Sequence, residues 1–148
     1  MEKFLLDDTY SVGDMLLDAQ HKVILGYMSK IYTYILADEK GRDLFELVER
    51  LDAFCKLHLL DEEKEMERMD FTTIEDHKYE HALFIRHLEN FAGRYVELDS
   101  VKGVDELLFL KGWFMEHIQV FDKRYADYRK QLTKPGTSYK QAGVDKGM

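Results

Sequence analysis

The sequence has few of the features that mark disulfide-bonded, membrane-spanning or nucleic-acid-binding proteins. Its one cysteine in 148 residues, Cys55, cannot form an internal disulfide and fits a reducing compartment, so we expect a cytoplasmic protein. No apolar run is long enough to cross a bilayer, and no basic region followed by an apolar stretch opens the chain. We therefore expect neither membrane insertion nor a secretion signal. The net charge of −8 argues against a nucleic acid partner, because phosphate contacts need a basic face.

Proline and glycine are also scarce, with one and nine residues, which leaves room for long helices. Four stretches repeat apolar residues at steps of three and four, the period of an amphipathic helix. We expect Asp18 to cap the first helix, whose apolar stripe runs to Leu36. Asp43 and Thr72 each precede a glutamate by three residues, the spacing of a capping box, and are expected to open the second and third helices. The fourth helix is expected to begin near Asp105.

The expected connections are short, at about 39–42, 70–73 and 99–104. Short connections make consecutive helices antiparallel neighbours. The sequence therefore predicts an all-α fold, an up-down-up-down antiparallel four-helix bundle in a single domain over residues 1–133. Residues up to about 17 are expected to form an arm packed on the bundle. The polar segment 134–148 is expected to be a flexible tail.

Five of the six histidines and two carboxylates carry the strongest functional signal. Buried imidazoles and carboxylates are costly unless paired or metal-bound, and no lysine or arginine stands in these stripes. Because the helices alternate in direction, all the sets fall at one end of the bundle. Imidazole with carboxylate suits Fe, Zn, Cu or Ni, and two metals with two bridging carboxylates would use every ligand. The candidate metal ligands are His21, His58, Glu62, His77, His81, His117 and Asp122.

Asp122 fits this pattern least well. It lies five residues after His117, ~140° away on a regular helix. It can reach the site through a π-bulge in the fourth helix, and otherwise approaches from the flank. Tyr125, in line with His117, is expected either to contact a bridging group or to pack in the core. His87 falls off its stripe and is expected at the surface.

Four segments resemble the ligand motifs of the hemerythrin family, in its single-domain bacterial form: SVGDMLLDAQHK, HLLDEEKEM, DHKYEH and HIQVFDKRY. The resemblance implies a cofactor of two iron ions, Fe2+ or Fe3+, with an open position on one of them. It implies reversible O2 binding there, with O2 held as hydroperoxide, for storage, delivery or scavenging rather than enzymatic turnover. The implied ligands are His77, His81 and His117 for one iron, His21 and His58 for the other, and Glu62, Asp122 and an oxo or hydroxo group as bridges.

The apolar residues beside the ligands are expected to form a dry O2 pocket as well as ordinary core. Leu59 stands where the family usually has an aromatic residue, and Phe114 where it usually has a leucine, so the two changes could compensate in volume. The tryptophan usual near the family's N-terminus is absent from the first ten residues. The expected pocket residues are Ile24, Leu25, Leu59, Trp113, Phe114 and Ile118.

Two other functions share this site. The chain could be an O2 or redox sensor acting through a protein partner, with the tail as its only output segment. It could also be a di-iron enzyme, such as a peroxidase or an enzyme that reduces NO or O2. The sequence has no Glu-x-x-His pair of the kind found in oxygen-activating carboxylate bundles, which favours binding over oxidation chemistry.

Overall fold

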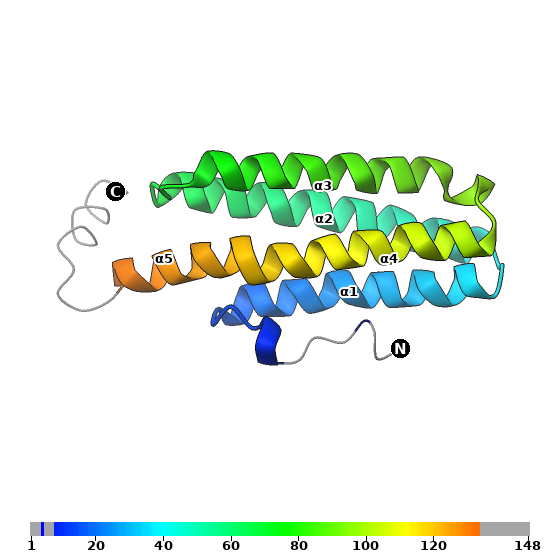
Figure 1. Cartoon of the computed structure of the whole chain (residues 1–148), viewed down its shortest axis with the longest axis horizontal. Helices are drawn as coiled ribbons and strands as arrows, with labels where there is room; N and C mark the ends of the chain where they lie inside the picture. Colours follow the sequence, from blue (N-terminus) through cyan, green and yellow to red (C-terminus); the bar gives the residue numbers. More distant parts are fainter. Residues whose placement is uncertain (1–3, 5–7, 134–148) are drawn as a thin grey trace.

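The computed structural model describes residue 4 and residues 8–133, and all regular structure in them is helical, which confirms the expected all-α fold. The long helices lie side by side (Figure 1). They are α1 (Met15–Leu36), α2 (Arg42–Arg68), α3 (Ile74–Arg94) and α4 (Ser100–His117), the last continued by the π-helical turn η4 (Ile118–Asp122) and α5 (Lys123–Thr133). Short 3-10 turns, η2 (Asp8–Tyr10) and η3 (Tyr95–Glu97), precede α1 and α4. The predicted tail 134–148 and residues 1–3 and 5–7 of the predicted arm lie outside the described residues.

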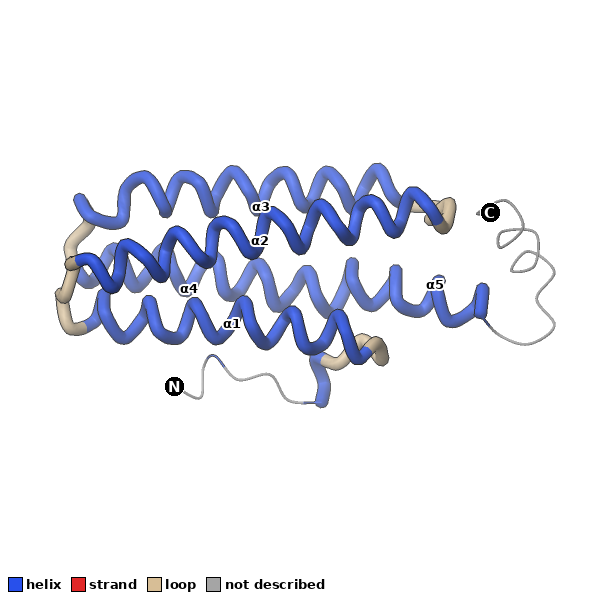
Figure 2. Tube along the Cα trace, turned by 180° about the vertical axis from the view of Figure 1, so that it is seen from behind, coloured by secondary structure: helices blue, strands red, loops and turns tan. Residues whose placement is uncertain are grey.

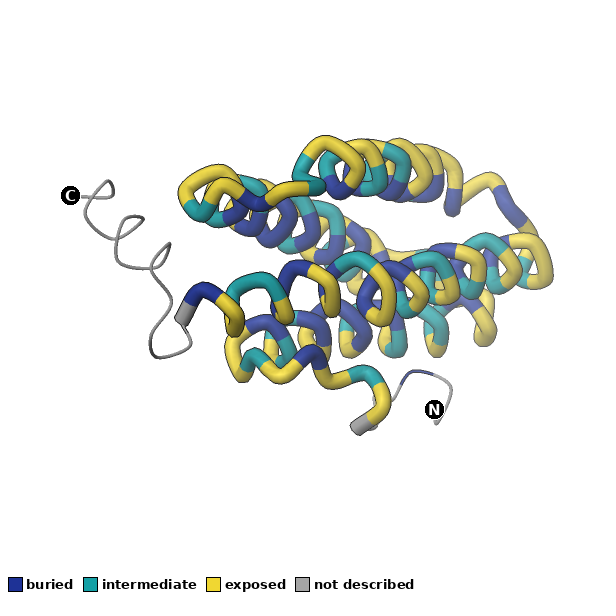
Figure 3. The backbone as a smooth tube through the Cα atoms, turned by 60° about the vertical axis from the view of Figure 1, so that its left-hand side comes forward, coloured by how far each residue is buried: buried dark blue, intermediate teal, exposed yellow. Residues whose placement is uncertain are grey.

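The helices close into a ring, since α1 packs on α2, α2 on α3, α3 on α4 and α4 on α1. Figure 2 shows the α1–α2 and α3–α4 connections at one end and the α2–α3 connection at the other. Buried residues follow the inward faces of the helices (Figure 3). Leu36 departs from its predicted stripe and is 59% exposed. The neighbouring Ile35 is 1% exposed, so the buried face of α1 ends there, and Leu36 points ~100° away from it around the helix.

The start of α1 differs from the prediction. Asp14 is the N-cap, and its side chain accepts a hydrogen bond from the Leu17 amide at 3.0 Å. Asp18 lies one turn inside the helix. Its carboxylate accepts hydrogen bonds from the Val12 amide at 3.0 Å and the Ser11 hydroxyl at 2.6 Å. The prediction was wrong because Asp18 holds the preceding segment against the helix rather than capping it.

The predicted capping boxes of α2 and α3 were also wrong. Gly41 and Thr73 are the N-caps, and neither makes a side-chain capping hydrogen bond. Asp43 lies inside the first turn of α2, where its carboxylate accepts a hydrogen bond from the Tyr34 hydroxyl at 3.5 Å. An acidic residue in a first turn still stabilises the helix through the dipole of its N-terminus. Thr72 stays outside α3.

Helix α4 begins at Ser100, earlier than the predicted Asp105. The side chain of Asp99 caps it by accepting from the Lys102 amide at 2.8 Å. One turn later Gly103 is buried against α1, and a Cβ there would lie 2.9 Å from Cγ2 of Ile35. Glycine therefore lets α1 and α4 approach closely at the end of the bundle that holds the α1–α2 connection.

Candidate metal centre

All seven predicted ligands are buried and lie at the end of the bundle that holds the α2–α3 connection. They come from α1, α2, α3, α4 and η4, so every helix of the ring contributes. Their ligand atoms form two groups that share Glu62, and within each group the atoms lie within 4.8 Å of one another. The larger group is Glu62, His77, His81, His117 and Asp122, and the smaller is His21, His58 and Glu62.

The carboxylate of Asp122 faces histidines of both groups. Its Oδ1 lies 3.0 Å from Nε2 of His77 and 3.0 Å from Nε2 of His117. Its Oδ2 lies 2.9 Å from Nε2 of His21. One oxygen thus faces the α3 and α4 histidines, and the other faces the α1 histidine.

Glu62 repeats this division. Its Oε1 lies 3.2 Å from Nε2 of His77 and 3.0 Å from Nε2 of His81. Its Oε2 lies 3.9 Å from Nε2 of His58. Both carboxylates therefore stand between a set of three imidazoles and a set of two, the position of a bridging ligand.

The π-helical turn η4 brings Asp122 inward. The sequence predicted that such a turn could do so, and η4 over Ile118–Asp122 confirms it. Asp122 is 1% exposed, while the neighbouring Phe121 is half-buried and its ring stacks on His117 with centroids 5.4 Å apart. The wider turn therefore brings Asp122 to the face of His117, although a regular α-helix would place it ~140° away.

Two polar side chains that the sequence analysis missed hold histidines from behind. His58 donates from Nδ1 to the amide oxygen of Gln20 at 2.7 Å, and His81 donates from Nδ1 to a carboxylate oxygen of Glu63 at 2.8 Å. In the neutral imidazole, such a hydrogen bond keeps the proton on Nδ1 and directs the lone pair of Nε2 inward. Both partners directly adjoin a candidate ligand in the sequence, which was the available signal. A residue next to a ligand on the same helix points ~100° away from it, so the contact of Gln20 or Glu63 with another helix was not evident.

The site contains a concentration of unsatisfied polar atoms. Among the described residues, buried atoms without a hydrogen-bond partner include both carboxylate oxygens of Glu62 and Nε2 of His21, His58, His81 and His117. Each such atom costs about 1–3 kcal/mol when left unpaired. They converge on one another, and a cation between them would satisfy them together. Five nitrogens and two carboxylates without thiolates fit iron and do not suit a structural zinc site.

Charge in the site supports the same interpretation. Burial favours the neutral form of Asp122, but three surrounding histidines hold its pKa well below the usual value. Burial and Asp122 also work against ionised Glu62, yet the imidazoles of His77 and His81, with Nε2 3.0–3.2 Å from Oε1, lower its pKa to about 2. Burial lowers the pKa of His58. The two carboxylates are therefore ionised at neutral pH, the form in which a carboxylate binds metal.

The predicted pocket residues do not all face the same group. Phe114 lies edge-on to His21, with centroids 5.6 Å apart, beside the two-histidine group. Trp113 is half-buried and stacks on His117 at 5.1 Å, beside the three-histidine group. Leu59 lines a groove between α2 and α3 on the side of His81. Ile24, Leu25, Phe114 and Ile118 are each at most 1% exposed.

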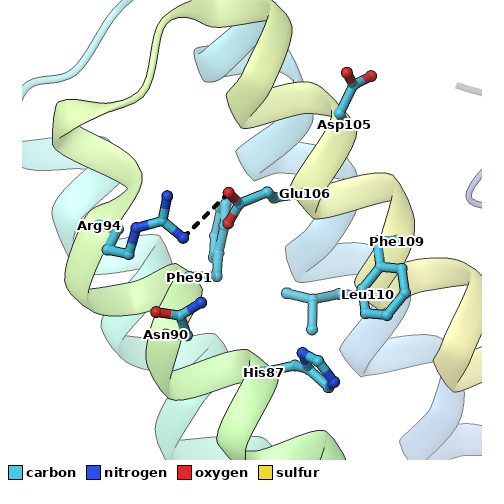
Figure 4. A pocket seen from close by; sticks show the side chains of 8 residues that line it. All are labelled: His87, Asn90, Phe91, Arg94, Asp105, Glu106, Phe109 and Leu110. Carbon is cyan, nitrogen blue, oxygen red and sulfur yellow. Dashed lines mark ion pairs between the residues drawn. The ribbon is translucent and has the colours of Figure 1, made fainter.

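Tyr125 and His87 both lie outside the ligand set. The Tyr125 hydroxyl lies 3.8 Å from the Met69 sulfur, which favours core packing over contact with a carboxylate. His87 is exposed, as predicted, and its ring contacts Phe109 with centroids 5.0 Å apart. It lines a cavity of about 270 Å³ between α3 and α4, crossed by the 3.3 Å ion pair of Arg94 and Glu106 (Figure 4). This cavity is separate from the candidate ligands.

The family description "Hemerythrin HHE cation binding domain" matches residues 12–128. The chain belongs to the hemerythrin family. The match spans the stretch from the segment before α1 to α5 and includes all seven candidate ligands of this hemerythrin domain.

Several curated relatives are similar over most of their length. A bacteriohemerythrin of Clostridium acetobutylicum is 25% identical over 84% of this chain and 99% of its own. A bacteriohemerythrin of Pseudomonas aeruginosa is 28% identical over 86% of this chain and 82% of its own. A hemerythrin-like protein of Naegleria gruberi is 27% identical over 82% and 90%. No solved structure is a significant match. In the described part of this hemerythrin domain, no helix is long and apolar enough to span a membrane.

Proposed function

We propose that the chain binds O2 reversibly at a non-heme di-iron centre, for storage, delivery or scavenging. The observation that carries this proposal is the division of both carboxylates between three imidazoles and two. Such a division would give one metal fewer protein ligands than the other and would leave it a position for a small molecule. Membership of the hemerythrin family and similarity to bacteriohemerythrins support the same function.

The proposed ligand sets follow the two groups. His77, His81 and His117 would hold one iron, His21 and His58 the other, and Glu62 and Asp122 would bridge them. When bound, two irons supply the electron pair that reversible O2 binding requires. The two ionised carboxylates offset part of the metal charge, which lets the pair bind in a buried site.

The surrounding side chains serve to keep water out. Ile24 and Phe114 are buried beside the two-histidine group. They offer no polar atom that could donate a proton there, which would slow the loss of bound O2 as peroxide or superoxide. A site with five imidazoles and two carboxylates donates less charge to a metal than a carboxylate-rich site, which favours binding over an enzymatic role.

We also propose a cytoplasmic location, which fits the single cysteine.

The test is an iron assay with visible spectra on protein reduced without air and then exposed to O2. Two irons per chain, with an absorption band that appears with O2 and disappears on its removal, are the expected result. Irreversible oxidation would favour the redox sensor or the di-iron enzyme. No iron after expression with ample iron would refute the metal centre. His117→Ala should lose iron, whereas His87→Ala, the matched exposed histidine, should keep it.

A further inference from the structure

The two hydrogen bonds from Nδ1 of candidate ligand histidines differ in the charge of their acceptors. His81, of the three-histidine group, donates to the carboxylate of Glu63, and His58, of the two-histidine group, donates to the neutral amide of Gln20. Both contacts are short, at 2.8 Å and 2.7 Å, and both histidines are at most 3% exposed. Geometry is thus matched on the two sides of the site, while formal charge is not.

We propose that Glu63 is a positioning residue that makes the two irons unequal, so that the iron of the three-histidine group gives up its electron more readily. This inference rests on the proposed di-iron site. A carboxylate that accepts a hydrogen bond from Nδ1 makes the imidazole a stronger donor to a metal at Nε2. Its negative charge also favours the metal state of higher positive charge. An amide at the same place orients the ring without adding charge.

The location of Glu63 suits this role. Its side chain is 22% exposed and lines a groove of about 570 Å³ between α2 and α3, which also reaches His81. Because the carboxylate is partly exposed to solvent, its charge does not carry the full cost of burial. Substitution at this position also leaves the packed core untouched, which makes Glu63 a clean site for a test.

The redox step involves electrons alone. Each iron passes from Fe2+ to Fe3+ by giving one electron to a soluble mediator, and no bond is made or broken. The structure therefore predicts two one-electron midpoints separated in part by Glu63.

The test is an anaerobic potential titration, followed by visible spectra, of iron-loaded wild type and variants. Glu63→Gln keeps an acceptor for His81 and removes the charge. We expect it to retain two irons and to raise one midpoint, so that the oxidised-to-reduced ratio at a fixed potential falls about tenfold, or 59 mV. Glu63→Leu also removes the hydrogen bond, and we expect a further 10–100-fold loss in Fe2+ affinity.

The control is Asp61→Asn, which removes the same charge two residues earlier on α2, from an exposed side chain. In this variant the oxidised-to-reduced ratio of each iron at a fixed potential should stay within about twofold of the wild-type value. The reciprocal variant Gln20→Glu places a carboxylate beside His58 and should lower the other midpoint. If Glu63→Gln loses iron, Gln20→Glu decides the question alone.

Equal shifts in Glu63→Gln and Asp61→Asn, or no shift in Glu63→Gln and Gln20→Glu, would overturn the inference. A wild-type chain without two irons would overturn it together with the proposed function. A wild type that binds two irons and O2, with midpoints indifferent to Glu63, would overturn this inference and leave the proposed function standing.

Discussion

The close approach of α1 and α4 at Gly103 yields a quantitative prediction. A Cβ at this position would lie 2.9 Å from Cγ2 and 3.9 Å from Cδ1 of Ile35, whose side chain is 1% exposed. Overpacking of this kind costs ~1–3 kcal/mol. Alanine gains up to ~1 kcal/mol over glycine from helix propensity. We expect Gly103→Ala to lower the free energy of unfolding by up to ~2 kcal/mol.

Gly112 is the matched control on the same helix. It is exposed, and a Cβ there would meet nothing within 4 Å. Gly112→Ala should therefore stabilise the chain by up to ~1 kcal/mol. Urea unfolding of both variants gives the difference, expected at ~1–3 kcal/mol. In an Ile35→Ala background, which removes the opposing methyl, Gly103→Ala should cost nothing. Equal effects of the two glycine substitutions would refute the close-contact argument.

Three further predictions concern the opposite end of the bundle. Tyr128→Phe removes a hydroxyl that donates to the carbonyls of Met69 and Asp70 at 2.8 Å, and should cost ~1 kcal/mol in urea unfolding; an unchanged midpoint would contradict it. Metal-free protein should be most stable between about pH 4.5 and 6.5 in urea titrations across pH. The lowered pKa of Glu62, about 2 against 4.5, gives stability above pH 4.5 that is lost as the pH falls, and the raised pKa of His81, about 9 against 6.5, gives stability below pH 6.5 that is lost as the pH rises. Iron at a thousandfold excess over its dissociation constant should add ~4 kcal/mol, so a chelator should lower the Tm by ~10 °C, and an unchanged Tm would argue against binding to the folded state.

The helices and the inward faces could be predicted because apolar spacing records burial directly. His58 and Glu62 are four residues apart, as are His77 and His81, so each pair could be placed on one helix face without knowledge of the fold. Helix starts were harder, because several acidic residues stood near each start and tertiary contacts decided their roles. Asp18, for example, binds the preceding segment rather than the helix end.

The remaining features depended on contacts between helices. Asp122 required a π-helical turn that no spacing rule demands, and the family resemblance was what favoured it. Gln20 and Glu63 have partners 38 and 18 residues away along the chain, so only the assembled bundle reveals their roles. The assignment of the seven residues as iron ligands remains a prediction, for which the paired iron and O2 assays are the test.

The position of all seven candidate ligands at one end has a consequence for how the chain opens. Bound iron would join residues as far apart as His21 and Asp122, closing long loops that the unfolded chain must otherwise pay entropy to close. That cross-link would act beside the α2–α3 connection and not at the other end, which relies on packing such as Gly103 against Ile35. Metal should therefore slow amide hydrogen exchange most around the 69–73 turn, while the 37–41 end frays as it does without metal. Bound metal would therefore hold the four helices together at one end of the bundle only.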